Sequence, residues 1–407
     1  MRTLTSATFG AALALIAGAT GASAAPAPAA TAQPMACNGA LSAGARPALA
    51  DFQAAIATKD AAKIATADAA AQAKAKAPAD ICTLGQLELQ AAGQANDFTA
   101  ASAAVTRALG SGAANGTLFA PVVANIGANQ YNSKNYAGAY ASFMQASQLN
   151  PNDPEPLVFA AGAKAKMNDS AAAIALYQRA FALRAKGATL KQEWLAQAVA
   201  DAYRAKSPAV VPLTVDWVSA YPTPSNWHDT LQIYAGAAGL DATALIDVYR
   251  LERATKGLTA EGDYANFANL LLGKGYANEA KAVLAEGVAA NLVKPTSPVV
   301  VEARQRAPGE IAGLAASAAA ARTAASGQVA LNVGERLYGT GDYAKAAELF
   351  RIAATKPGAD SATANLKLGE ALAMSGDTAG AKAAFQAVTG PKADLAKFWL
   401  IWLGQRG

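Results

Sequence analysis

The segment from Asp216 to Asp229 gathers side chains that could do chemistry. It holds two tryptophans, a tyrosine, the chain's one histidine and two carboxylates within 14 residues. Trp217 and Trp227 could stack on sugar faces, and carboxylates could accept hydrogen bonds from sugar hydroxyls. One hypothesis is therefore a glycan-binding platform of Trp217, Trp227, His228 and Asp229. A glycan-active enzyme would need two such carboxylates facing each other across about 5–10 Å.

The same segment also fits an ordinary helical core. Trp227 and Tyr234 recur at helical spacing and would share one buried face. Ser225 or Asn226 would then cap their helix, and the earlier tryptophan would lie in the core beside it. His228 could also act as a pH-sensitive group. The spacing favours the core and leaves these interpretations open.

Composition and motifs argue against most catalytic chemistry. A single histidine excludes a multi-histidine metal centre, and two cysteines exclude zinc ribbons and Cys-ligated clusters. The chain has no nucleophile elbow, phosphate-binding loop, dinucleotide fingerprint or zinc-protease motif. We therefore expect a non-catalytic protein with no metal and no cofactor.

Charge and hydropathy describe a long, Ala-rich chain. Of its 407 residues, 53% are hydrophobic and 15% are charged, and the formal net charge is +5. The basic residues are scattered, whereas nucleic acid would need a concentrated basic patch. We therefore expect no nucleic-acid partner. Beyond the N-terminal region no segment has about 18 uninterrupted apolar residues, so we expect no transmembrane helix.

The N-terminus predicts export. Residues 1–24 combine a positive Arg2, a short apolar stretch and a small-x-small cleavage pattern, as secretory signal peptides do. Residues 25–36 are rich in proline and alanine and predict an extended linker. We expect the exported chain in the periplasm or at the outer-membrane periphery, with the medium as a further destination.

Export would permit a disulfide, and Cys37 and Cys82 are the two candidates. A bridge would close a loop of about 45 residues and stabilise the fold by about 4 kcal/mol in the chain-entropy account. We favour this bridge over two buried free thiols.

An internal repeat of helix pairs is the strongest pattern. From Leu41 onward the chain is rich in helix formers, and period-2 runs are scarce. Small residues would let two helices of a pair approach, and an aromatic residue would fill the gap between pairs. The clearest tandems span 120–187 and 327–390, with marker residues Gly127, Ala139, Phe143, Ala146, Ala161, Ala173, Tyr177, Ala180, Gly334, Ala346, Phe350, Ala353, Gly369, Ala381 and Phe385.

These markers resemble the tetratricopeptide repeat (TPR), whose period is about 34 residues. The resemblance implies an all-α, TPR-like α-solenoid of stacked antiparallel helix pairs. The stretches 221–227, 247–251 and 262–264 also resemble a group of exported proteobacterial TPR proteins of undefined function. That resemblance implies the fold and export, and no activity.

The repeats divide the rest of the chain into three parts. Residues 37–290 are predicted to form one TPR-like helical array, and residues 327–407 a C-terminal TPR pair with a capping helix. Residues 291–326 form a connector, in which an Ala-rich helix is expected over 310–325. A hinge between two arrays is the alternative for the connector, and an exposed docking or membrane-surface helix is the alternative for the cap.

A TPR array usually binds its partner through a groove lined by the first helix of each pair. On the repeat register, Tyr131 and Asn132 would line this groove in one repeat, and Gln328, Glu335 and Tyr338 in another. Of the Lys, Asn and Arg set that clamps a terminal carboxylate in chaperone-binding TPRs, the first repeat has only the asparagine. The predicted groove is therefore weakly charged.

We predict an exported, non-catalytic TPR scaffold that binds an envelope protein or peptide. The alternatives are a glycan-associated protein or glycan-active enzyme that uses the segment Trp217–Asp229, and a scaffold that assembles with itself. The sequence leaves the oligomeric state open.

Overall fold

The computed structural model describes residues 37–406, so the predicted signal peptide and linker lie outside the described residues. Within that range the regular structure is helical, apart from one isolated antiparallel bridge between Cys37 and Ala114. The chain divides into two compact units, unit 1 (Met1–Leu190) and unit 2 (Lys191–Gly407). The fold is the all-α, TPR-like solenoid that the repeats predicted.

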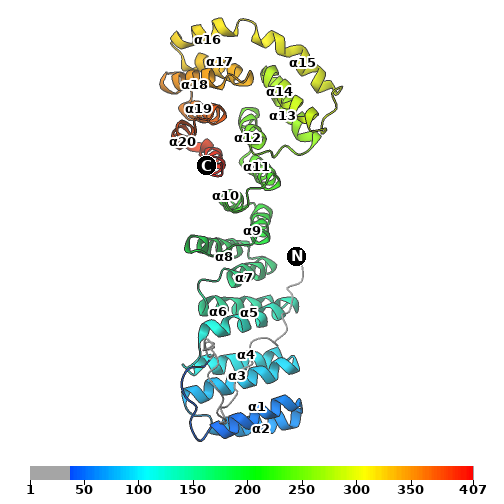
Figure 1. Cartoon of the computed structure of the whole chain (residues 1–407), viewed down its shortest axis with the longest axis vertical. Helices are drawn as coiled ribbons and strands as arrows, with labels where there is room; N and C mark the ends of the chain where they lie inside the picture. The colour runs from blue at the N-terminus through cyan, green and yellow to red at the C-terminus, as the bar shows by residue number, and fades with distance from the viewer. Residues whose placement is uncertain (1–36, 407) are drawn as a thin grey trace, which may run out of the picture. The chain divides into compact units, whose positions relative to one another are not determined.

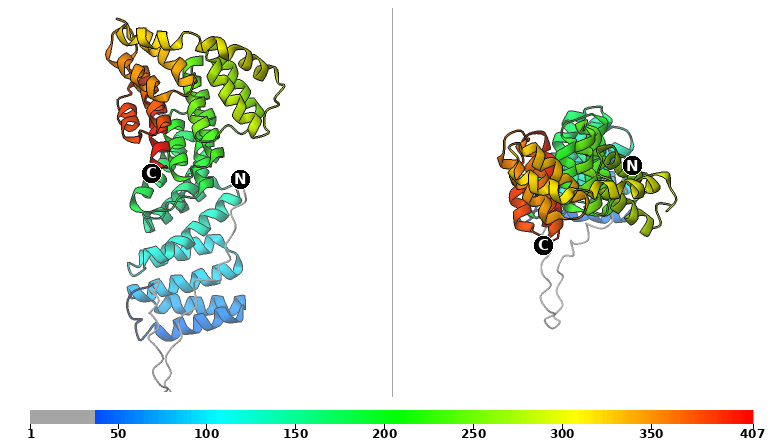
Figure 2. Two further views of the ribbon diagram at one scale, coloured as in Figure 1. Left: turned by 45° about the horizontal axis from the view of Figure 1, so that its top comes forward. Right: turned by 90° about the horizontal axis from the view of Figure 1, so that it is seen from above.

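Unit 1 is a stack of antiparallel helix pairs. Each helix packs on the next as a hairpin, and successive hairpins pack on one another, as Figures 1 and 2 show in blue to teal. The pairs are α1 (Arg46–Thr58) with α2 (Ala61–Lys74), α3 (Pro78–Ala95) with α4 (Phe98–Gly110), α5 (Gly116–Asn132) with α6 (Tyr136–Leu149), and α7 (Glu155–Lys166) with α8 (Ser170–Ala182), followed by the 3-10 turn η1 (Leu183–Lys186).

Unit 2 curls back on itself. The chain runs through α9 to α14, crosses at α15 and α16, and returns through α17 to α21 (Figure 1), so that α10 packs against α21 and α14 against α17. The helices are α9 (Gln192–Arg204), α10 (Val210–Ala220), α11 (Pro224–Ala238), α12 (Ala242–Ala254), α13 (Glu261–Lys274), α14 (Ala277–Ala289), α15 (Pro298–Ile311), α16 (Leu314–Thr323), α17 (Gly327–Gly339), α18 (Tyr343–Thr355), α19 (Ser361–Ser375), α20 (Thr378–Gln386), the 3-10 turn η2 (Gly390–Lys392) and α21 (Ala393–Gly404).

Close approach of glycine and phenylalanine holds the repeat pairs together. A Cβ atom added at Gly127 would lie 2.9 Å from the ring of Phe143, and one added at Gly334 would lie 2.6 Å from the ring of Phe350. The corresponding distance from Gly369 is 2.5 Å, also to a phenylalanine ring. These separations are shorter than real carbon contacts, so only glycine fits. The small and aromatic markers therefore meet as the repeat pattern predicted.

Short polar side chains begin the second helix of each clear repeat. Asn135, Asp342 and Asp377 are the N-caps of α6, α18 and α20, and each accepts a hydrogen bond from the backbone N–H three residues later. Such caps satisfy N–H groups that have no partner inside the helix. The same rule holds at α11, but there the cap is Thr223. The expected caps Ser225 and Asn226 lie inside the first turn, because Pro224 starts the helix at N1.

The predicted connector is part of unit 2. Helix α15 packs on α13 and α14, and α16 packs on α17 and α18, so neither helix is a free hinge. The Ala-rich helix begins at Leu314 rather than at residue 310, because Gly313 takes a left-handed conformation (φ +71°) between α15 and α16. The compact units divide at Leu190, inside the range 37–290 that the sequence pattern assigned to one array.

The terminal helix α21 covers the last repeat. Phe398 and Trp399 are fully buried, and Trp399 stacks on Phe385 with ring centres 5.5 Å apart. Just beyond the helix, Gln405 donates a hydrogen bond from Nε2 to the carbonyl oxygen of Val218 at 2.9 Å. Helix α21 is therefore a cap and not an exposed docking helix. No helix in residues 37–406 is long and apolar enough to cross a membrane.

Candidate functional site

Six charged side chains from four helices meet in the interior of unit 2. The helices are α12, α14, α17 and α19, which the curl of the unit brings together. We call this set the charge cluster, and its members are all buried: Asp247, Arg250, Glu279, Glu335, Lys367 and Glu370.

Arg250 is the centre of the charge cluster. Its Nε and Nη2 atoms donate to the two carboxylate oxygens of Glu279 at 2.8 and 2.6 Å. Nη2 also donates to Glu335 at 2.8 Å, and Nη1 donates to Glu370 at 3.2 Å. The guanidinium lies over the ring of Tyr338, 4.1 Å from its centre. One side chain of α12 thus contacts α14, α17 and α19.

Lys367 makes a second bridge within the cluster. Its ammonium group donates to Asp247 Oδ1 and lies 2.8 Å from Glu335 Oε1 and 4.0 Å from Glu370 Oε2. The pairs Asp247–Lys367 and Arg250–Glu370 each join residues 120 positions apart. The charge cluster therefore links α12, early in unit 2, to α19 near its end.

The cluster holds four carboxyl groups and two cations, so their protonation states diverge. Burial opposes ionisation of Glu335, but the charges of Arg250 and Lys367 outweigh it and lower its pKa to about 2. Burial, reinforced by the charge of Asp247, raises the pKa of Glu370 to about 8. Oε1 of Glu370 is buried without a hydrogen-bond partner. The raised pKa of Glu370 favours its protonated form near neutral pH, which would reduce the excess negative charge.

A pocket of about 280 Å³ lies beside the cluster. Glu279 and Tyr338 belong to its lining, together with Arg253, Lys281 and the half-exposed Ile311. The charges in this lining are already engaged in part, since Arg253 donates to both carboxylate oxygens of Glu286 at 2.9 and 2.5 Å. The pocket therefore borders the charge cluster at Glu279.

The curl removes part of the predicted groove. Glu335 is 5% exposed and Tyr338 is 4% exposed, so neither side chain lines an open groove. Both face Arg250, which occupies the inner face of α17. Gln328 is exposed and donates to Asn332 Oδ1 at 2.7 Å. The repeat register correctly predicted that Glu335 and Tyr338 face inward. It could not predict that Arg250 on α12 of the same chain covers them.

Unit 1 presents the equivalent positions differently. Tyr131 and Tyr338 hold the same place in their repeats, and each meets a second tyrosine edge-on. The ring centres of Tyr131 and Tyr136 are 5.3 Å apart and those of Tyr338 and Tyr343 are 4.9 Å apart, with an interplanar angle of 69° in both pairs. Tyr131 is half-buried, and Asn132 beside it is exposed.

The predicted glycan platform is not assembled. Trp217 is 6% exposed and Trp227 is 2% exposed, so both rings belong to the hydrophobic core and neither offers a face to a sugar. Trp227 packs edge-on against Phe398 of the terminal helix at 6.3 Å. His228 is partly buried and Asp229 is exposed. Helical spacing, which put Trp227 and Tyr234 on one buried face, explains this outcome.

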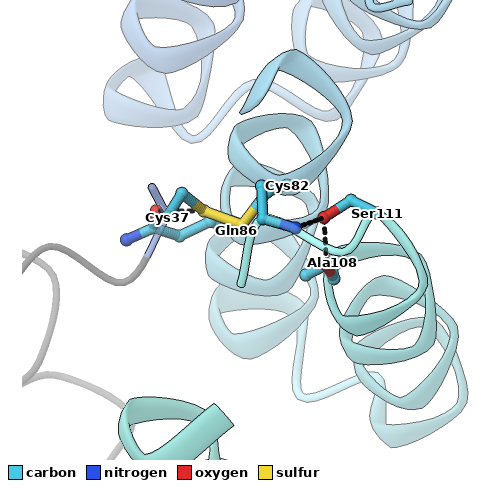
Figure 3. The surroundings of a disulfide bond; sticks show 6 residues. Cys37, Cys82, Gln86, Ala108 and Ser111 are labelled. Atoms are coloured by element: carbon cyan, nitrogen blue, oxygen red, sulfur yellow. Dashed lines mark hydrogen bonds between the residues drawn. A yellow bond between two sulfur atoms is a disulfide. The ribbon is translucent and has the colours of Figure 1, made fainter. Parts of the chain in front are cut away.

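Cys37 and Cys82 form a disulfide in unit 1, with sulfur atoms 2.07 Å apart (Figure 3). The bridge ties the first described residue to α3. Asn38 adds a backbone hydrogen bond to the carbonyl oxygen of Ala113 at 2.8 Å, so the same segment also pairs with the loop after α4. Gln86 Oε1 lies 3.6 Å from Cys37 Sγ.

Within residues 37–406, one group of side chains has donor atoms suited to a metal ion. His228 Nδ1 and carboxylate oxygens of Glu252 and Asp263 lie within 4.8 Å of one another. However, Nδ1 is 2.6 Å from Glu252 Oε1, a hydrogen-bond distance. Two ligands that each stand about 2.0–2.2 Å from a zinc ion would be farther apart than this. Asp263 Oδ2 also accepts hydrogen bonds from two backbone N–H groups. The observed spacing fits a shared proton better than a metal.

The charge cluster was not predicted from the sequence. A signal was present in two charge pairs at helical i,i+3 spacing, Asp247 with Arg250 and Lys367 with Glu370, in a chain with 15% charged residues. Each pair alone is typical of a solvated helix surface. Nothing in the spacing links one pair to the other.

Comparisons with known proteins show distant similarity. No family model matches the chain, and no curated protein matches it in sequence. Among solved structures it is similar to the crystal structure of the APC/C hetero-tetramer Cut9–Hcn1, with 11% sequence identity and a TM-score of 0.18 over 88% of this chain and 87% of that one. A score this low carries no argument, so the assignment of the fold rests on the chain's own helix pairs.

Proposed function

We propose that the chain is an exported, non-catalytic TPR scaffold that binds a protein or peptide partner in the cell envelope. One contrast carries the proposal. Tyr338 is covered by Arg250 of its own chain, whereas Tyr131, at the equivalent repeat position, is half-buried beside the exposed Asn132. Unit 2 fills its own inner face, and unit 1 presents a polar, aromatic edge at which a partner can bind.

The disulfide supports the exported location. Disulfides persist in oxidising compartments and are rare in the cytosol. The bridge between Cys37 and Cys82 therefore agrees with the signal-like residues 1–24. Edman sequencing of the protein recovered from the envelope fraction is expected to start at Ala25. Recovery of the full-length chain from the cytosol, with two alkylatable thiols, would contradict export.

Site-specific crosslinking in cells tests the binding surface. A photo-reactive residue is placed at Asn132, at the end of α5, and as a control at the exposed Gln178 on α8. The expected result is one dominant crosslinked protein from position 132 and not from position 178. Tyr131→Ala is expected to weaken that crosslink while the circular dichroism spectrum stays unchanged. Identical products from both positions would reject this surface.

The glycan alternative is not retained, because Trp217 and Trp227 lie in the core. Self-assembly remains an outcome of the same experiment. Crosslinks from position 132 to a second copy of the chain, and to nothing else, would replace the partner by the protein itself.

A further inference from the structure

A group of titratable side chains joins three consecutive helices of unit 2. His228 lies on α11, Glu252 on α12 and Asp263 in the first turn of α13. His228 Nδ1 is 2.6 Å from Glu252 Oε1, 3.1 Å from the carbonyl oxygen of Gly257 and 4.0 Å from Asp263 Oδ2. The carbonyl oxygen of Gly257 can only accept a hydrogen bond, so this contact favours a proton on Nδ1, in the neutral or the charged ring.

The burial of the two main partners differs. The side chain of Glu252 is fully buried, and that of His228 is 27% exposed. The loop between α12 and α13 also approaches closely, since a Cβ atom added at Gly257 would lie 3.0 Å from Glu252 Cγ and 3.3 Å from His228 N. Solvent protons can reach the imidazole, while the carboxylate that it faces is shielded from water.

The charged groups with the largest effect on the imidazole are acidic. Besides Glu252 and Asp263, Asp229 on α11 adds a negative charge. Gln232 on α11 donates its neutral amide to both carboxylate oxygens of Glu252, at 3.4 and 3.2 Å. Among these groups, protonated His228 is therefore the one source of positive charge beside Glu252.

We propose that His228, Glu252 and Asp263 form a proton-operated latch, which fastens α11, α12 and the start of α13 at mildly acidic pH and loosens them at mildly alkaline pH. With a proton shared between His228 and Glu252 across the 2.6 Å contact, the buried side chain of Glu252 is not left as an unpaired carboxylate. Without it, two carboxylates flank a neutral ring, and one of them is buried. Loss of the proton therefore weakens the junction of the three helices.

The pKa shifts give the sign of the effect. Burial lowers the pKa of His228, but the charge and hydrogen bond of Glu252 outweigh this and raise it above its ordinary value. Burial raises the pKa of Glu252 to about 7 against the opposing charge of His228. Both values are raised on folding, so near neutral pH the folded pair holds more protons than the unfolded pair. Its stabilisation is complete below the unfolded values and declines as pH rises through about 7.

The single histidine makes the test direct, because the full exported chain gives one imidazole signal in an NMR titration. We expect the midpoint of His228 above the ordinary value of about 6.5. In Glu252→Gln it is expected to fall to that value or below, because the negative charge is lost. Glu261→Gln removes an exposed carboxylate two residues from Asp263 and is the matched control, with no expected change. A wild-type midpoint at or below about 6.5, or no response to Glu252→Gln, would overturn the latch.

A second measurement uses the wild-type chain alone, in case a variant fails to fold. Amide hydrogen exchange is compared at about pH 6 and about pH 8.5 after correction for the intrinsic rate. Protection of α11 to α13 is expected to fall at the higher pH relative to α3 and α4 in unit 1. Equal ratios at both values would overturn the proposal. A melting temperature that rises with added ZnCl2, together with a pH dependence that EDTA abolishes, would also overturn the proposal. His228, Glu252 and Asp263 would then form a metal site.

Discussion

Arg250 on α12 lies over the ring of Tyr338 on α17, with its guanidinium carbon 4.1 Å from the ring centre. Both side chains are buried, and a desolvated contact of this kind is worth about 2 kcal/mol. Tyr338 holds a repeat position that the sequence pattern assigned to a partner groove. On unit 2 this predicted groove position is therefore covered by an arginine of the same chain.

Removal of Arg250 is expected to destabilise unit 2 strongly. Arg250→Ala leaves the carboxylates of Glu279 and Glu335 buried without their main cation, and breaking a buried pair in this way costs about 3–5 kcal/mol. Urea unfolding followed by tryptophan fluorescence measures this change in unit 2 alone, because all five tryptophans lie there. Lys345→Ala removes one partner of an exposed ion pair and should change stability by less than about 1 kcal/mol. Equal effects of the two variants would contradict a closing role for the cluster.

Two carboxyl groups of the cluster are expected to respond oppositely to pH. The pKa of Glu370 is raised to about 8, so its stabilisation is complete below the unfolded value and is lost as pH rises through 8. Glu370→Gln should therefore cost little at neutral pH and flatten the loss of stability between about pH 7 and 9.

The contribution of Glu335 to stability changes with pH in the opposite direction. Its pKa is lowered to about 2, so its stabilisation is present above the unfolded value and is lost as pH falls through 2. Glu335→Gln should therefore be strongly destabilising at neutral pH. Denaturant unfolding at a series of pH values checks both variants, and similar profiles for the two would show that the protonation states are wrongly assigned.

The close approach of Gly334 and Phe350 gives a packing prediction. Gly334→Ala places a methyl group 2.6 Å from the ring, and such overpacking costs about 1–3 kcal/mol. Gly273→Ala is the control, since nothing lies within 4 Å of a Cβ atom there. The control should be neutral or stabilising by up to about 1 kcal/mol. Thermal unfolding of both variants measures the difference. An equal loss of stability in Gly334→Ala and Gly273→Ala would reject the steric explanation.

The disulfide is expected to stabilise unit 1 selectively. It closes a loop of 45 residues, and loss of a native bridge costs about 2–5 kcal/mol. The double substitution of Cys37 and Cys82 by alanine should lower the midpoint of the unfolding transition of unit 1, measured by circular dichroism. The tryptophan transition, which reports on unit 2, should not move. A parallel shift of both transitions would show that the units unfold together.

Local patterns were sufficient to predict the helix pairs. Gly127 and Phe143 lie on neighbouring helices of one hairpin, and Asn135 caps the helix that follows it directly, so the physical cause lies within a short stretch of chain. The burial of Trp227 follows in the same way from its spacing to Tyr234 on one helix face. These features could therefore be predicted without knowing the tertiary structure.

The charge cluster could not be predicted because its cause is not local. Asp247 and Lys367 meet only because unit 2 curls back through α15 and α16. The curvature of a repeat array is the sum of small rotations between successive repeats, so no short segment determines it. The i,i+3 spacing of Asp247 and Arg250 equally suits an exposed helix. Glu335 and Tyr338 were therefore assigned to the correct side of α17 but to the wrong neighbour.

The 120-residue separation of Arg250 and Glu370 also sets an order of events during biosynthesis. At about 5–20 residues per second, a ribosome makes Glu370 about 6–24 s after Arg250. Once α14 has been made, α12 and α14 lack α17 and α19, which complete the burial of their charged side chains. A chain that ends before α19 would therefore hold Asp247 and Arg250 without Lys367 and Glu370, the partners that α19 supplies.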